Sequence, residues 1–148
     1  MKIICVGRNY AAHAGEMNAP VPAEPVIFLK PDTAVLKKFE DFYYPDFTQD
    51  VHYEGELYFR ICKDGKYIKR KFAPLHLDCV GVGVDFTARD LQRRLKAGGL
   101  PWEISKAFNQ SAALSEFFPN DRYADIRDLH FALHINGCLL YTSPSPRD

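Results

Sequence analysis

The chain has 148 residues, a usual size for one domain and too short for two comfortable ones. Its 19 Lys and Arg residues balance 19 Asp and Glu residues, and no run of one charge gathers on a predicted helix or tail. The composition therefore gives no indication of a nucleic-acid partner. The apolar start, from Met1 to Val6, is far shorter than a signal sequence or a membrane span. We expect a single cytoplasmic domain that does not bind a membrane.

The N-terminal part of the chain predicts two short apolar strands separated by a helix and a proline-rich loop. Residues 2–6 are expected to form the first strand and residues 26–29 the second. Between them, Asn9 can cap a short helix. That helix would place His13 and Glu16 three residues apart on one face.

The middle of the chain predicts a long two-faced strand. Residues 51–61 alternate with a period of two, so Glu54 and Glu56 are expected on the same face. The Asp-Gly pair at 64–65 is a turn signal, after which residues 67–68 are expected to begin the returning strand of a hairpin.

The next predicted elements are a central strand and a helix. Residues 79–84 form an apolar run punctuated by glycine, which indicates a buried strand that ends at Asp85. Thr87 is expected to cap a helix over residues 88–97, which two glycines terminate.

The end of the chain, residues 138–148, is rich in serine and proline. It follows a predicted strand at 131–135 and an Asn-Gly turn at 136–137. The tail resembles one reading frame of a sequencing-library adaptor, so we expect it to be non-native and the domain to be limited to residues 1–137. The alternative is a native C-terminus that would begin midway through a hairpin.

Three acidic residues suggest a metal site. Two carboxylates on one strand face resist joint ionisation unless a raised pKa, a basic partner or a cation neutralises them. Together with Asp85, Glu54 and Glu56 would form an all-oxygen site that favours Mg²⁺, Mn²⁺ or Ca²⁺ over zinc. The same Glu-x-Glu pattern is common on ordinary solvated strands. His13 and Glu16 are likewise either a surface pair or an acid–base dyad with a polarised imidazole.

Basic and sulfur-containing residues are less informative by pattern alone. Arg89 and Gln92 lie three residues apart on the predicted helix, where they can converge beside Asp85. Arg89 and Lys106 can equally be surface cations. The four cysteines lack C-x-x-C spacing and are expected to be structural thiols.

Several sequence blocks follow one another along the chain. They are Gly7-Arg8-Asn9-Tyr10 with His13 and Glu16, Glu24-Pro25, Phe28-Leu29-Lys30-Pro31, Tyr53-Glu54-Gly55-Glu56-Leu57, Asp85-Phe86-Thr87-Ala88-Arg89-Asp90-Leu91-Gln92, and Leu100-Pro101-Trp102 leading to Lys106-Ala107-Phe108. In this order and spacing they resemble the fumarylacetoacetate hydrolase family, most of all its small bacterial and mitochondrial members. The resemblance implies a mixed α/β, mostly β fold, a β-roll with few short helices. It also implies a homodimer, and further C-terminal strands with a Gly-Thr-Pro loop that this sequence lacks, so the fold is expected to be incomplete at its C-terminus.

The resemblance also implies roles for individual residues. The implied metal ligands, for Mg²⁺ or alternatively Mn²⁺ or Ca²⁺, are Glu54, Glu56 and Asp85. The implied catalytic residues are His13, Glu16 and Lys106. The implied substrate-binding residues are Arg8, Arg89 and Gln92. In this interpretation His13 activates water on a mobile lid helix, and Lys106 stabilises developing negative charge.

The implied substrate is a small 2-oxo acid, which can chelate the ion through its carboxylate and keto oxygens. Breaking the adjacent C–C bond leaves an enolate. Our leading hypothesis is a metal-dependent hydrolase of acylpyruvates such as fumarylpyruvate or acetylpyruvate. One alternative is an oxaloacetate decarboxylase or keto–enol tautomerase at the same site. The other is a non-catalytic or inactive fragment.

Overall fold

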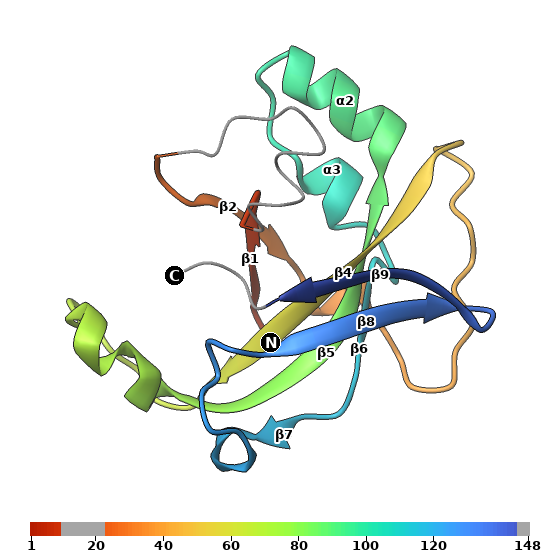
Figure 1. Ribbon diagram of the computed structural model, residues 1–148. Helices are drawn as coiled ribbons and strands as arrows, with labels where there is room; N and C mark the ends of the chain where they lie inside the picture. The colour runs from red at the N-terminus through yellow and green to blue at the C-terminus, as the bar shows by residue number, and fades with distance from the viewer. Residues whose placement is uncertain (10–22, 145–148) are drawn as a thin grey trace.

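The computed structural model describes residues 1–9 and 23–144, the coloured part of the chain in Figure 1. This part consists mostly of strands with few short helices, which confirms the predicted fold class. The predicted helix that carries His13 and Glu16 lies outside the described residues. Within the described ranges no helix is long and apolar enough to cross a membrane.

In chain order the described elements are β1 (Ile3–Gly7), β2 (Val26–Lys30), η1 (Asp32–Ala34), β3 (Val35–Leu36), β4 (Val51–Ile61), η2 (Arg70–His76), β5 (Leu77–Ala88), α2 (Arg89–Ala97), α3 (Glu103–Lys106), β6 (Ala112–Leu114), β7 (Phe118–Pro119), η3 (Asn120–Arg122), β8 (His130–Ile135) and β9 (Cys138–Pro144).

The central sheet has the strand order β3-β6-β5-β4, and β7 also pairs with β5. Its two longest strands, β4 and β5, are antiparallel and pair along almost their whole length. The predicted strand at 51–61 is confirmed, and β5 extends beyond the predicted 79–84 at both ends. The alternation in β4 survives in this register, so the two glutamates share one face.

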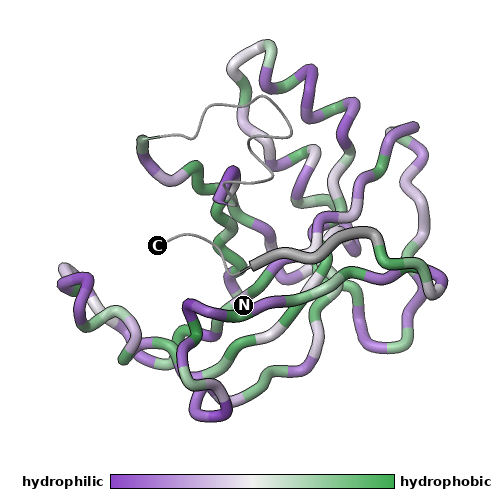
Figure 2. The backbone as a smooth tube through the Cα atoms, in the orientation of Figure 1, coloured by the Kyte–Doolittle hydropathy of each residue, from purple (hydrophilic) through white to green (hydrophobic). Residues whose placement is uncertain are grey.

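A separate two-stranded ribbon, β1 and β2, carries the predicted N-terminal strands and runs close to the central sheet (Figure 1). It is largely hydrophobic, whereas α2 is largely hydrophilic (Figure 2). On one face of the ribbon, Ile4 pairs with Leu29 and Val6 with Ile27, and these four side chains are 41% to 56% exposed. On the other face, Phe28 and Lys30 are buried.

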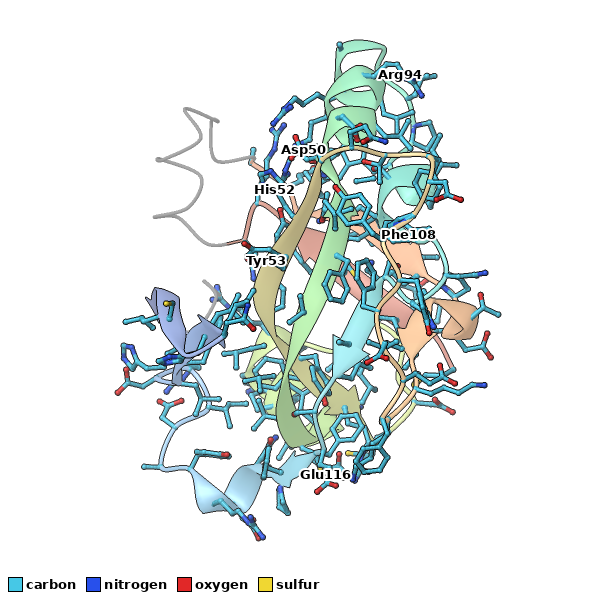
Figure 3. The ribbon with its side chains drawn as sticks, turned by 90° about the vertical axis from the view of Figure 1, so that its right-hand side faces the viewer. Asp50, His52, Tyr53, Arg94, Phe108 and Glu116 are labelled. Atoms are coloured by element: carbon cyan, nitrogen blue, oxygen red, sulfur yellow. The ribbon has the colours of Figure 1, made fainter. Side chains whose placement is uncertain are left out.

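The start of α2 is attached to the loop before β4. The Arg89 backbone N–H donates to the Asp50 carbonyl over 2.7 Å, and the Arg93 guanidinium lies 3.1 Å from the Asp50 carboxylate. Asp50 and His52 lie together where β4 begins (Figure 3), with 3.0 Å between His52 Nε2 and Asp50 Oδ1. The predicted cap was wrong, because the N-cap is Ala88 and makes no side-chain hydrogen bond. The loop contacts supply the anchoring instead.

The segment between β4 and β5 differs from its prediction. Residues 67–68 are not a strand, and the partner of β4 begins only at Leu77. Residues 62–75 are all exposed and belong to no strand, so their apolar side chains are not buried against the sheet. They form a long arm with the turn η2, which projects from the end of the two strands (Figure 1). A hydrogen bond of 2.8 Å from the Cys62 N–H to the His76 carbonyl closes its base.

The last described element is the hairpin of β8 and β9. Its turn residues Asn136 and Gly137 both have positive φ, +51° and +79°, as the tight Asn-Gly turn requires. The predicted strand at 131–135 is confirmed within one residue. Residues 138–144 pair with β8, and their non-native origin stays a prediction.

Candidate active site

The predicted metal ligands lie on one face of the central sheet. Glu54 of β4 is directly opposite Asp85 of β5, and Glu56, two residues further along β4, is opposite Gly83. Residues directly opposite in an antiparallel pair have Cβ atoms about 5 Å apart. The sequence therefore brings three acidic side chains together in the way that the alternation of β4 predicted.

Lys106 lies between two of these carboxylates. Its Nζ donates to Glu54 Oε2 over 2.6 Å and to Asp85 Oδ2 over 2.7 Å, and the residue is 3% exposed. Burial lowers the pKa of Lys106, but the charges of Asp85 and Glu54 and the hydrogen bonds outweigh burial and raise it above its ordinary value. Lys106 is thus a fixed positive charge at the site, supplied by the short helix α3.

Lys30 is a site residue that sequence reasoning missed. It is buried at the end of β2, and its Nζ lies 2.9 Å from Asp85 Oδ1. It also donates to the Ser111 hydroxyl and the Ser111 carbonyl over 3.0 Å each, and to the Lys106 carbonyl. One signal was present in the sequence, because Lys30 continues the inward-facing alternation of an apolar strand, where an unpaired lysine is costly.

Arg89 and Gln92 converge as predicted. Arg89 donates to the Glu54 carboxylate, and its other terminal nitrogen donates to Gln92 Oε1 over 2.6 Å. Both residues are buried. Burial alone would raise the pKa of Glu54, but the charges of Lys106 and Arg89 hold it at about 2. Glu54 therefore stays ionised across the physiological range.

Arg8, the third predicted substrate-binding residue, lines the same cavity. Its guanidinium carbon is 5.9 Å from the centre of the Trp102 ring, and its Nε is buried without a hydrogen-bond partner in the described part of the chain. Its φ of +59° is unusual for a residue with a side chain. Such backbone conformations persist where surrounding contacts fix them, often at functional sites.

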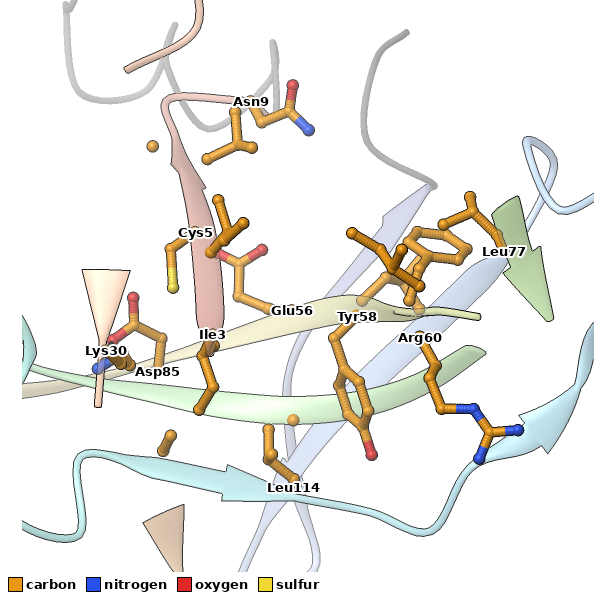
Figure 4. Close-up of a pocket in the computed structure, with 18 of the residues that line it drawn as sticks. Ile3, Cys5, Asn9, Lys30, Glu56, Tyr58, Arg60, Leu77, Asp85 and Leu114 are labelled. Carbon is orange, nitrogen blue, oxygen red and sulfur yellow. Dashed lines mark ion pairs between the residues drawn. The ribbon is translucent and has the colours of Figure 1, made fainter. Parts of the chain in front are cut away.

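The cavity extends from these residues along β4 (Figure 4). Lys30 and Asp85 lie together at one end, Glu56 and Cys5 lie beside them, and Tyr58 and Arg60 lie further along the strand. The pKa of the Cys5 thiol is raised to about 11, chiefly by burial and next by the charge of Asp85. Cys5 is thus a neutral thiol, as expected of a structural cysteine.

The carboxylates fit a hard divalent cation in kind and in position, because all three are oxygen donors on one face. Asp85 Oδ1 lies 2.9 Å from the Lys30 ammonium, so a cation at this oxygen would share it with Lys30. As the side chains are placed, no three His, Cys, Asp or Glu residues in the described ranges converge on a single point. An ion would compete with Lys106 and Lys30 for carboxylate oxygens.

The structure thus brings together seven of the nine predicted site residues. They are Arg8, Glu54, Glu56, Asp85, Arg89, Gln92 and Lys106. The remaining two, His13 and Glu16, lie outside the described residues.

The chain is similar to proteins of one family. The family model of the fumarylacetoacetate hydrolase C-terminal domain matches residues 2–145. A mitochondrial oxaloacetate tautomerase of Bos taurus is 38% identical over 135 residues, covering 91% of this chain and 61% of the relative. A mitochondrial oxaloacetate decarboxylase of Dictyostelium discoideum is 36% identical over 137 residues, covering 92% of this chain and 63% of the relative. The chain therefore spans about three-fifths of the length of these relatives.

A solved structure shares the fold at similar identity. The fumarylpyruvate hydrolase of Pseudomonas aeruginosa, in complex with Mn²⁺ and pyruvate, is 38% identical and superimposes with a TM-score of 0.88. The match covers 97% of this chain and 64% of that one.

Proposed function

Because the chain belongs to the fumarylacetoacetate hydrolase family, we propose that it carries the catalytic site of a divalent-metal-dependent enzyme that forms an enolate from a small 2-oxo acid. We propose oxaloacetate as the substrate and its keto–enol tautomerisation or decarboxylation as the reaction. The observation that supports this most directly is the buried ammonium of Lys106 between Glu54 and Asp85. A fixed cation in a cavity of low polarity favours the form of the substrate in which negative charge moves onto oxygen.

Each described residue has a physical role in this proposal. Lys106 stays protonated, because its pKa is raised, so it stabilises negative charge and does not act as a base. Arg89, oriented by Gln92, offers a guanidinium to the substrate carboxylate next to the keto group. Lys30 holds Asp85 from the opposite side and fixes the carboxylate in place.

The proposed metal ligands are Glu54, Glu56 and Asp85, with Mg²⁺ or Mn²⁺ as the expected ion. When bound, the ion would act as a Lewis acid on the keto oxygen of the substrate. The Mn²⁺ in the related fumarylpyruvate hydrolase supports a divalent ion, and the acid-rich face of β4 and β5 supplies suitable donors.

Hydrolysis of acylpyruvates, our leading hypothesis from the sequence, becomes the second candidate. The similarity to the fumarylpyruvate hydrolase favours it. The names of the oxaloacetate relatives support the first candidate about equally. We rank the oxaloacetate reactions first because loss of CO₂ from oxaloacetate needs no activated water, whereas hydrolysis requires one and hence the proposed dyad of His13 and Glu16.

The test is turnover by the purified chain with Mg²⁺ or Mn²⁺. We expect oxaloacetate to be enolised or decarboxylated, measured by absorbance of the enol and by release of CO₂, and Lys106→Met to abolish the activity. The matched control is Lys66→Met, which removes an exposed lysine of the arm. Turnover of acetylpyruvate alone would support the second candidate. If the folded chain turns over neither, the inactive-fragment hypothesis replaces both.

A further inference from the structure

Lys96 is a second basic residue beside Trp102, and it lines the same cavity as Arg8. Its Nζ is 4.8 Å from the centre of the indole ring, and it comes from the last turn of α2. Arg8 and Lys96 therefore both lie near the ring of Trp102, and both line the same cavity as Arg89. Neither the predicted site nor the proposed reaction uses Lys96.

The indole that carries these cations is held in place. A Cβ at Gly7 would come within 3.0 Å of Trp102 Cζ3, so the ring packs directly on the backbone of β1. The ring of Phe28, on the other strand of the ribbon, has its centre 6.2 Å from the centre of the Trp102 ring. The backbone carbonyl of Trp102 accepts from the Ser105 hydroxyl over 2.7 Å. Trp102 is thus a rigid platform between β1, β2 and α3.

The charges around this platform are not balanced. Glu54, the nearby carboxylate, is already shared by Lys106 and Arg89. In the described part of the chain, Arg8 and Lys96 have no carboxylate partner within ion-pair distance, and the Nε atoms of Arg8 and Arg89 are buried without a hydrogen bond. Burial and then the charges of Arg89 and Arg8 lower the pKa of Lys96. Crowded cations that lack a counter-ion are stabilised by an anion.

We propose that Lys96 and Arg8, on the platform of Trp102, form a second anion subsite that binds the distal carboxylate of a dicarboxylic 2-oxo acid. This inference rests on the proposed function, since it assigns the substrate class of the same cavity. The primary carboxylate would bind near Arg89, and the second would reach Arg8 and Lys96, which line the same cavity and have no carboxylate partner among the described residues. A dicarboxylic acid such as oxaloacetate would then be preferred over a 2-oxo acid with an apolar end.

The chain offers a direct reporter, because Trp102 is its single tryptophan. We would titrate the Mg²⁺-loaded chain with 2-oxoglutarate and with 2-oxopentanoate, in which a methyl group replaces the distal carboxylate, and follow tryptophan fluorescence. Neither ligand carries a carboxylate or an acyl group on C3, so neither has the bond that the proposed reactions break, and binding does not depend on turnover. We expect 2-oxoglutarate to bind at least about tenfold more tightly, which is the usual effect of one good charged contact.

Lys96→Met keeps an unbranched apolar stem against the indole and removes the charge. It should weaken 2-oxoglutarate binding roughly tenfold and leave 2-oxopentanoate within about twofold. Lys96→Arg should retain the preference. The control is Lys66→Met, another lysine over an aromatic ring, 5.1 Å from the centre of Tyr67 on the exposed arm.

Equal affinity of the wild type for both acids, or binding of neither, would overturn the subsite. So would an equal loss of both ligands in Lys96→Met, because that pattern reports a structural role. If the preference is present and depends on Lys96, but oxaloacetate and acetylpyruvate are not turned over, the subsite stands and the proposed function fails.

Discussion

Replacing Glu54 with glutamine removes the carboxylate that Lys106 and Arg89 share. The pKa of Glu54 is about 2, against an ordinary value of 4.5. At about 1.4 kcal/mol per pKa unit, this shift corresponds to about 3 kcal/mol of the free energy of unfolding. The side chain is 20% exposed, so solvent screening removes little of it. Breaking a buried ion pair typically costs a similar amount, about 3–5 kcal/mol.

The pH dependence gives the sign of the effect. Because the folded-state pKa is depressed, the stabilisation by Glu54 is fully present above about pH 4.5 and is lost as the pH falls toward 2. We expect Glu54→Gln to lower the free energy of unfolding by about 3 kcal/mol at pH 7, and by only about 1 kcal/mol at pH 3. Urea unfolding at both pH values, followed by circular dichroism in EDTA, measures this difference.

The control is Asp78→Asn, which removes the carboxylate of an exposed pair with Arg60, 2.7 Å apart. Solvent screens that pair, so its loss should change stability much less. A destabilisation by Glu54→Gln that is the same at pH 7 and pH 3 would refute the reasoning, because it would show that the charge of Glu54 does not contribute to the stability of the fold.

Three further predictions concern the surroundings of the site. Asp85→Asn should weaken Mn²⁺ binding at least about tenfold, measured by the electron paramagnetic resonance of free Mn²⁺, and unchanged affinity would remove Asp85 from the ligand set. Ser111→Ala removes the hydroxyl that accepts from Lys30 over 3.0 Å and should lower the free energy of unfolding by about 1–3 kcal/mol in urea titrations. An unchanged free energy would mean that the carbonyls of Ser111 and Lys106 are sufficient partners for Lys30. Gly7→Ala places a methyl group 3.0 Å from Trp102, so it should lower the free energy of unfolding by about 1–3 kcal/mol and shift the tryptophan emission. An unchanged spectrum would contradict the close packing of Trp102 on Gly7.

Local periodicity predicted the strands that carry the acidic face. The alternation over residues 51–61 depends only on neighbours in sequence, so it fixed which side of the strand Glu54 and Glu56 occupy. It failed at residues 67–68, where the Asp-Gly turn signal is followed by an exposed arm with the turn η2, which has Pro74 inside it, and the chain returns to the sheet only at Leu77. A turn signal predicts a hairpin only where the residues on both sides can bury a face together.

Long-range pairing is the part of the site that local patterns did not supply. A raised pKa, a basic partner or a cation could each neutralise the acidic face, and the local sequence pattern does not distinguish among these three. In the structure, basic partners neutralise Glu54 and Asp85. Lys30 lies 55 residues before Asp85, and the other partners lie 21 to 52 residues after the carboxylates they contact. Lys30 illustrates the difficulty, since its role depends on the packing of β2 against β5 and α3.

The same ion pairs explain why an all-carboxylate face can exist before any metal binds. A buried carboxylate without a partner would take up a proton or destabilise the fold. Lys106, Lys30 and Arg89 prevent this by supplying charge, and each donates to backbone or side-chain oxygens that fix its position. A divalent ion would therefore enter a site in which Glu54 and Asp85 are already paired and oriented, at the cost of competing with these ammonium groups. The site is organised to hold negative charge, first its own and then, in our proposal, that of a 2-oxo acid.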